Sequence, residues 1–85
     1  MPSVHANSID MREAADALAA ALTLGDERLV GVMTRNMRMA LAGRDVSRDR
    51  LATQSLLLRQ VERAAQAGAF AQAAPILTAF KSAVG

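Results

Sequence analysis

The sequence of 85 residues contains no cysteine, so neither a disulfide framework nor a thiolate metal site is available to it. Tryptophan and tyrosine are also absent, and phenylalanine occurs only at positions 70 and 80. The hydrophobic core must therefore be built mainly from Leu, Val, Ile, Met and Ala side chains.

Histidine is scarce, since His5 is the only one in the chain. Without a cysteine or a second histidine, it cannot anchor a transition-metal site of the usual kind. A catalytic base would need a pocket and a partner, and no serine lies in a nucleophile-elbow pattern. We therefore expect no enzymatic activity, no metal and no cofactor.

Long hydrophobic runs are missing as well. No apolar run in the sequence approaches the roughly 18–20 residues that are needed to cross a bilayer. The N-terminus also lacks the basic segment and the continuous apolar segment of a secretory signal. We expect a soluble, cytoplasmic protein with no membrane span.

Alanine, by contrast, is abundant. The 19 alanines favour helix and let helices approach closely. A chain of this length makes one small domain, which buries only about 60–65% of its unfolded surface. Small helical proteins of this kind often depend on oligomerisation or a partner for stability.

Apolar residues recur at helical spacing over residues 10–23, 27–42 and 48–67. Residues that begin or end helices flank these segments, namely Asp10, Gly25, Asp26, Gly43, Ser47 and Gly68. Short connections make neighbouring helices antiparallel. The sequence therefore predicts an all-α fold, a small bundle of three to four antiparallel helices built on a central helical hairpin. We expect residues 1–9 to form a flexible N-terminal tail and residues 10–85 a single helical domain.

Each predicted helix has a stripe of core residues. The stripes are Met11, Ala15, Leu18 and Leu22; then Leu29, Val30, Met33, Met37, Ala40 and Leu41; then Leu51, Leu57, Leu58, Val61, Ala64 and Ala65. A fourth set shares one face near the C-terminus: Phe70, Ala73, Leu77, Phe80 and Val84.

Two interpretations of this C-terminal segment remain open, because Pro75 cannot lie in a helix interior without a kink. In the first, the third helix runs on to about residue 73 and Pro75 lies in the first turn of a short fourth helix. In the second, Gly68 breaks the chain and Pro75 kinks the terminal helix.

Charge is unevenly distributed along the chain. Residues 1–27 carry five acids and one arginine, whereas residues 28–63 carry eight arginines and three acids. Arg48, Arg59 and Arg63 share the polar side of the third predicted helix, where salt pairing with Glu62 or with the acidic first helix is the ordinary explanation. The functional explanation is that these arginines bind the phosphates of a nucleic acid. Against it, acids interrupt the basic face and no aromatic platform for single strands is present. The alternative function is therefore a small basic nucleic-acid-associated or transcription-regulatory protein.

A strip of residues on the second predicted helix breaks the core pattern. Val32 and Met39 lie opposite its core stripe, between Arg28 and Arg35. Arginine forms bidentate contacts with carboxylates and methionine packs adaptably, so the strip suits an interface with an acidic, apolar partner. The other interpretation is that a neighbouring helix covers it.

The predicted interface has two further members. Leu56 lies outside the core stripe of the third predicted helix. Phe80, at the end of the last predicted helix, would extend the surface. The predicted partner-binding residues are therefore Arg28, Val32, Arg35, Met39, Leu56 and Phe80. A homodimer and a complex with another protein are equally compatible with such a helix face, whereas nucleic acid is the less favoured partner.

The pattern over residues 29–84 resembles that of small helical-hairpin proteins of type III secretion, namely needle and inner-rod subunits and needle co-chaperones. It consists of a polar N-terminus, a helix, a short turn and a second helix marked by Leu51, Gln54, Leu58, Phe80 and Val84. The chain departs from needle subunits by lacking tyrosine, and Gly68 and Pro75 interrupt the second helix. The resemblance implies a role in a bacterial secretion apparatus. We expect a non-enzymatic protein–protein interaction module that acts by helix-face docking, as an adaptor, chaperone-like protein or assembly subunit.

Overall fold

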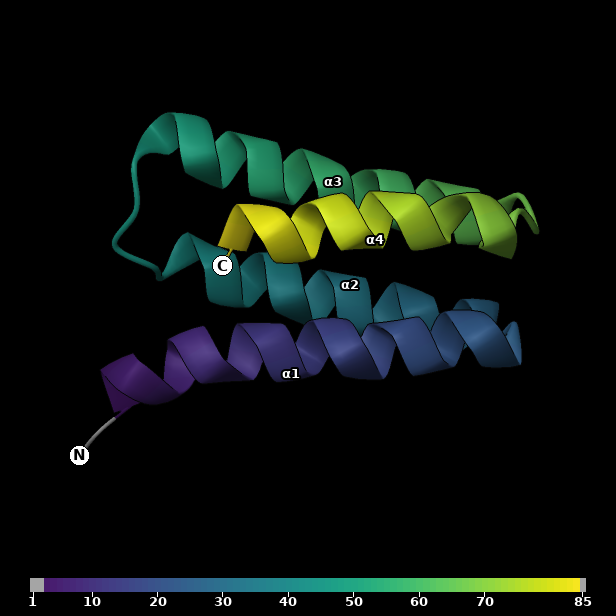
Figure 1. The fold of residues 1–85 in the computed structure, drawn as a ribbon, viewed down its shortest axis with the longest axis horizontal. Coiled ribbons are helices and arrows are strands. Elements are labelled where there is room, and N and C mark those ends of the chain that lie inside the picture. Colours follow the sequence, from purple (N-terminus) through teal and green to yellow (C-terminus); the bar gives the residue numbers. More distant parts are fainter. Residues whose placement is uncertain (1–2, 85) are drawn as a thin grey trace.

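The computed structural model describes the backbone of residues 3–84 and the side chains of residues 11–84. Within this part the chain forms four helices: α1 (Ser3–Leu24), α2 (Glu27–Ala42), α3 (Arg48–Gln66) and α4 (Phe70–Val84). The helices lie side by side and alternate in direction (Figure 1). The predicted all-α bundle of antiparallel helices is confirmed.

Each helix packs against two main neighbours. α1 contacts α2 and α4, and α3 likewise contacts α2 and α4. The α2–α3 connection lies at the same end of the bundle as the end of α4, and the two tighter turns lie at the other end (Figure 1). α4 therefore closes the bundle against α1 and α3, and it leaves the outer side of α2 uncovered.

Local polar contacts start α2 and α3 where the sequence predicts. The Asp26 carboxylate accepts a hydrogen bond from the Leu29 backbone N–H at 3.1 Å, and the Ser47 hydroxyl accepts one from the Arg50 backbone N–H at 3.3 Å. Both side chains satisfy an N–H group that has no partner within the helix. These two N-caps are confirmed.

Two of the three predicted glycine stops have the left-handed backbone. Gly25 has a φ of 69° and Gly68 a φ of 76°, which suits a residue without a Cβ. Gly43 is different, because it ends α2 with a φ of −94°. Its N–H donates instead to the Ala40 carbonyl in a tight turn, so Gly43 ends the helix as predicted but without the left-handed backbone of the other two.

The predicted start of α1 is also wrong. The helix begins at Ser3 rather than at Asp10, because neither proline nor glycine interrupts the sequence between them. Asp10 is therefore inside the helix. The flexible tail predicted over residues 1–9 extends outside the described residues, and its flexibility stays a prediction.

The C-terminal segment follows the second of the two interpretations in its connectivity. α3 ends at Gln66, Gly68 breaks the chain, and α4 runs through Pro75. Pro75 has no N–H to donate to the Ala71 carbonyl one turn earlier. α4 nevertheless stays helical through Pro75, because its apolar side is buried against α1 and α3.

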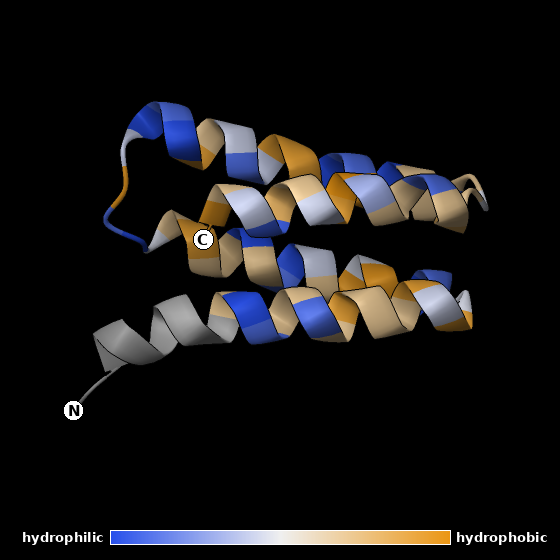
Figure 2. Ribbon diagram, in the orientation of Figure 1, coloured by the Kyte–Doolittle hydropathy of each residue, from blue (hydrophilic) through white to orange (hydrophobic). Residues whose placement is uncertain are grey.

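The core stripes of α1 and α3 are buried or packed against the core as predicted, and the shared apolar face of α4 packs against the core as well. α2 is rotated relative to its predicted stripe, since Leu29 and Ala40 are exposed and Thr34 is fully buried. The rotation arises because α2 packs against both α1 and α3. Hydrophilic residues recur along α3 from its first turn, whereas α4 carries few (Figure 2).

Two buried polar side chains were not predicted. The Thr34 hydroxyl donates to the Gly31 carbonyl at 3.1 Å within α2. Gln54 on α3 is 2% exposed, and its Nε2 donates to the Ala83 carbonyl at 3.0 Å in the last turn of α4. The second contact joins two helices, and it satisfies a carbonyl that has no partner within α4.

Candidate functional site

The strip predicted on α2 faces away from the bundle. Val32 and Met39, about two helical turns apart, are 52% and 70% exposed. Arg28 and Arg35 are exposed on the same side of the helix. We call these four residues the α2 strip. The interpretation in which a neighbouring helix covers the strip is wrong, because α4 packs on α1 and α3 instead.

A groove between the outer sides of α2 and α3 adjoins this strip. Three hollows that share lining residues form the groove, with volumes of ≈ 470, 400 and 240 Å³. We call it the α2–α3 groove. Its lining consists of Glu27, Arg28, Gly31, Val32, Arg35 and Arg38 from α2, and Ala52, Ser55, Leu56, Arg59, Gln60, Glu62, Arg63 and Gln66 from α3.

The groove brings together most of the residues that the sequence singled out. Leu56 is 54% exposed and lines two of the hollows, and Val32 lines the third with Arg28 and Arg35. Met39 belongs to the strip but not to the lining of the groove. Two predicted features, the strip on α2 and the exposed leucine on α3, therefore belong to one surface.

Phe80 is the exception, and its prediction as a partner-binding residue is wrong. Its side chain has no exposed surface. α4 packs against α1 and α3, so the face of α4 that holds Phe80 turns into the core beside Leu77. Phe80 stabilises the bundle and is not available to a partner.

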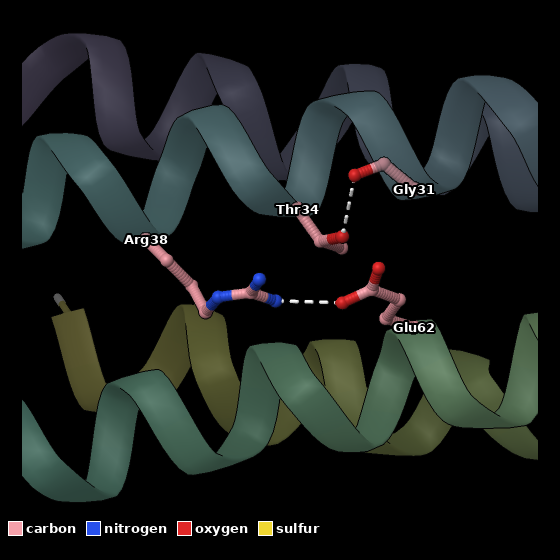
Figure 3. Close-up of polar contacts among 4 residues, drawn as sticks. All are labelled: Gly31, Thr34, Arg38 and Glu62. Carbon is pink, nitrogen blue, oxygen red and sulfur yellow. Dashed lines mark hydrogen bonds and ion pairs between the residues drawn. The ribbon is translucent and has the colours of Figure 1, made fainter.

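An ion pair crosses the groove. The Arg38 Nη1 lies 2.7 Å from the Glu62 Oε1, and the two side chains are 26% and 22% exposed. Figure 3 shows the two side chains extending toward each other between α2 and α3, beside the turn that holds Gly31 and Thr34. Glu62 therefore pairs with an arginine of α2, and not with Arg59 or Arg63 of its own helix.

The other arginines of the groove have no such partner. Within the described part of the chain, the ion pairs are Arg38–Glu62 and Lys81–Asp16. Asp16 on α1 thus pairs with a lysine of α4, and among the described side chains no acid of α1 pairs with an arginine of α3. Arg28, Arg35, Arg59 and Arg63 are exposed and leave four guanidinium groups for external contacts.

A fourth hollow, separate from the α2–α3 groove, lies between α1 and α4 and was not predicted. It has a volume of ≈ 340 Å³ and lies over Leu22, Phe70 and Leu77. Its sides include the small residues Ala19 and Ala74, whose short side chains leave it open. Alanines on adjacent helices produce such a hollow when they lie on facing sides. The sequence contains the alanines, but only the tertiary structure shows that Ala19 and Ala74 line the same hollow.

Side chains suited to holding a metal ion do not gather in the described residues. Between residues 11 and 84, no three His, Asp or Glu side chains are close enough together to hold a metal ion. His5 lies outside the described side chains. The surface described above carries exposed apolar and charged side chains.

No protein-family model, curated protein or solved structure matches the chain. Function must therefore be inferred from the chemistry of the surface itself. None of the helices in the described range combines the length and the apolar character of a membrane span.

Proposed function

We propose that this protein is a non-enzymatic interaction module that docks another protein through the α2 strip and the neighbouring Leu56. It acts as an adaptor, a chaperone-like protein or an assembly subunit. A secretion apparatus, the setting implied by the resemblance to type III secretion proteins, is one assembly in which such a module would work.

The observation that carries this proposal is the exposure of Val32 and Met39 on a helix whose opposite side is buried. Full burial of a Val or Met side chain is worth about 1.5–3 kcal/mol, and half or more of each side chain remains in water. Arg28 and Arg35 beside them add charge that selects and orients a partner. Apolar anchors with a charged rim are the usual make-up of a docking surface.

The double variant Val32→Gln plus Met39→Gln tests the proposal. We expect it to lose association with the partner while far-UV circular dichroism shows unchanged helix content, because both side chains point away from the core. The measurement is capture by immobilised protein from an extract of cells that express it, together with light scattering of the purified chain.

The matched control is Leu24→Gln, since Leu24 is 76% exposed at the end of α1 and outside the α2 strip. The control should retain every association that the wild type shows. Loss of helix content in the double variant would make Val32 and Met39 core residues. That result, or association that both variants retain equally, would remove the proposed function.

A further inference from the structure

We propose that the partner is an acidic amphipathic helix of another protein, which lies along the α2–α3 groove, and not a second copy of this chain. The inference rests on the proposed function and names the chemistry of its partner. Three observations carry it: the net charge of the groove, the arrangement of charge on the α2 strip, and the glycine beside Val32.

The first observation is the charge of the groove. Its lining holds five arginines and two glutamates, which leaves a net charge of +3. One arginine is already paired with Glu62, so the excess is carried by guanidinium groups on both sides of the groove. A carboxylate-rich helix would receive bidentate contacts from α2 and from α3 at once.

The second observation concerns self-association. The α2 strip carries Arg28 and Arg35 and no carboxylate. A symmetric dimer would bring the same face of two copies together, and each copy would set its two arginines against those of the other. Like charges in an interface are costly, so the strip disfavours its own copy and favours an acidic surface.

The third observation is the notch at Gly31. A glycine in a helix interior destabilises the helix relative to alanine, yet packing within the bundle does not require it here. An added Cβ would meet only the Glu62 Oε2, at 3.9 Å, which is an ordinary contact. The missing side chain instead keeps open the hollow of ≈ 240 Å³ beside Val32, where an apolar side chain of a partner helix fits.

The same surface fits a nucleic acid less well. Val32, Leu56 and Met39 offer apolar area that a phosphate backbone has nothing to match, and Glu27 lines the groove as well. An amphipathic helix supplies both apolar and acidic groups on one face. α2 has 16 residues and is about 24 Å long, which sets the length of helix that the groove accommodates.

The test uses a synthetic peptide of the same length as α2, with leucine at the a and d positions of its heptads, glutamate at the e and g positions beside them, and alanine elsewhere to favour helix. A matched peptide carries lysine in place of every glutamate. We expect the acidic peptide to bind the full-length protein in isothermal titration calorimetry, with weaker binding as salt increases, and the lysine peptide not to bind.

Substitutions in the groove locate the binding. Arg59→Glu plus Arg63→Glu should weaken binding of the acidic peptide by about tenfold or more, since two charges change sign and the net charge of the groove falls by four units. Arg12→Glu plus Arg50→Glu makes the same change in net charge on residues outside the groove and should alter binding by about twofold or less. If the reversed pair fails to fold, Arg59→Gln plus Arg63→Gln gives a neutral test. Gly31→Gln should also weaken binding, because it fills the notch.

Several results would overturn the inference. They are binding of neither peptide, equal binding of both, indifference to the Arg59 and Arg63 substitutions, and displacement of the acidic peptide by duplex DNA. A dimer in light scattering that the Val32 and Met39 variant abolishes would show that the occupant is a second copy. If association through the α2 strip persists without any dependence on Arg59 and Arg63, this inference fails and the proposed function stands.

Discussion

Gly31 and Gly68 show how differently one residue type acts in two backbone settings. Gly68 has a φ of 76° and nothing within 4 Å of the position of an added Cβ, so its conformation alone accounts for a glycine there. Gly31 lies in the middle of α2 with ordinary helical geometry. Neither steric space nor backbone angle requires glycine at that position.

Alanine substitutions should therefore have opposite effects at the two sites. Gly31→Ala should raise the free energy of unfolding by about 0.5–1 kcal/mol through helix propensity. Gly68→Ala should lower it by about 1 kcal/mol, because a left-handed residue with a Cβ costs about 1–2 kcal/mol. Urea unfolding followed by far-UV circular dichroism measures both, and this probe suits a chain without Trp or Tyr. A destabilised Gly31→Ala variant would contradict the helix geometry described for α2.

Gln54 and Thr34 mark the limit of reasoning from single residues. Both are polar, so neither belongs to an apolar stripe, yet both are buried. The Thr34 hydroxyl and the Gln54 Nε2 each donate to a carbonyl, which lowers the cost of burial, whereas the Gln54 Oε1 is buried without a partner among the described residues. The partner of Thr34 lies within its own helix and was open to prediction, whereas the Ala83 carbonyl is brought to Gln54 only by the packing of α4 on α3.

At the scale of the helices, boundaries depend on local chemistry and were therefore largely predictable. Asp26 and Ser47 act through the backbone N–H groups three residues ahead, so the sequence contains the whole interaction. The start of α1 was mispredicted because an aspartate such as Asp10 can begin a helix but also occurs inside one, and α1 runs through it from Ser3. An aspartate of this kind marks the start of a helix only where the residues before it are not helical.

In α4 the sequence opposes the observed structure, because Pro75 lies in the interior of the helix. Pro75→Ala should raise the free energy of unfolding by about 1–3 kcal/mol, because it restores an N–H for the Ala71 carbonyl and removes the clash of the ring. The greater freedom of the unfolded chain offsets part of this gain, by about 0.4–1 kcal/mol. Thermal and urea unfolding measure the change.

The matched control for Pro75→Ala is Ala79→Pro, at an exposed position about one turn later in α4. It should destabilise the protein by about 3 kcal/mol or more. A loss of stability in Pro75→Ala would mean that the proline supports the path of α4, and the prediction would be wrong.

At the scale of the whole molecule, the closing of the bundle by α4 decides the roles of Phe80 and of the α2 strip. Because α4 packs between α1 and α3, Phe80 faces the core, and the outer face of α2 is left without a covering helix. The same topology places Leu56 beside the groove that Val32 lines. The packing of α4 therefore excludes Phe80 from the predicted interface and leaves Val32 and Leu56 on one exposed surface.

Phe80 and Leu56 can be compared directly, since sequence patterning assigned both to the interface. Phe80→Ala should lower the free energy of unfolding by about 3–5 kcal/mol, a large part of the 5–15 kcal/mol typical of a domain. Leu56→Ala should change it by about 0.5 kcal/mol or less. Urea unfolding of both variants checks this, and equal effects would contradict the buried position of Phe80.

The sequence by itself determined the helical class, the first two connections and most core positions, because caps, glycines and helical periodicity act over a few residues, whereas the connection between α3 and α4 was decided only by the structure. It also identified Val32 and Met39 as side chains opposite the core of their helix. Only the tertiary structure decided which faces are covered, since that depends on which helices become neighbours. The burial of Phe80 and Gln54, the pairing of Arg38 with Glu62 and the groove between α2 and α3 all arise from contacts between residues distant in the chain, whose geometry no local pattern contains.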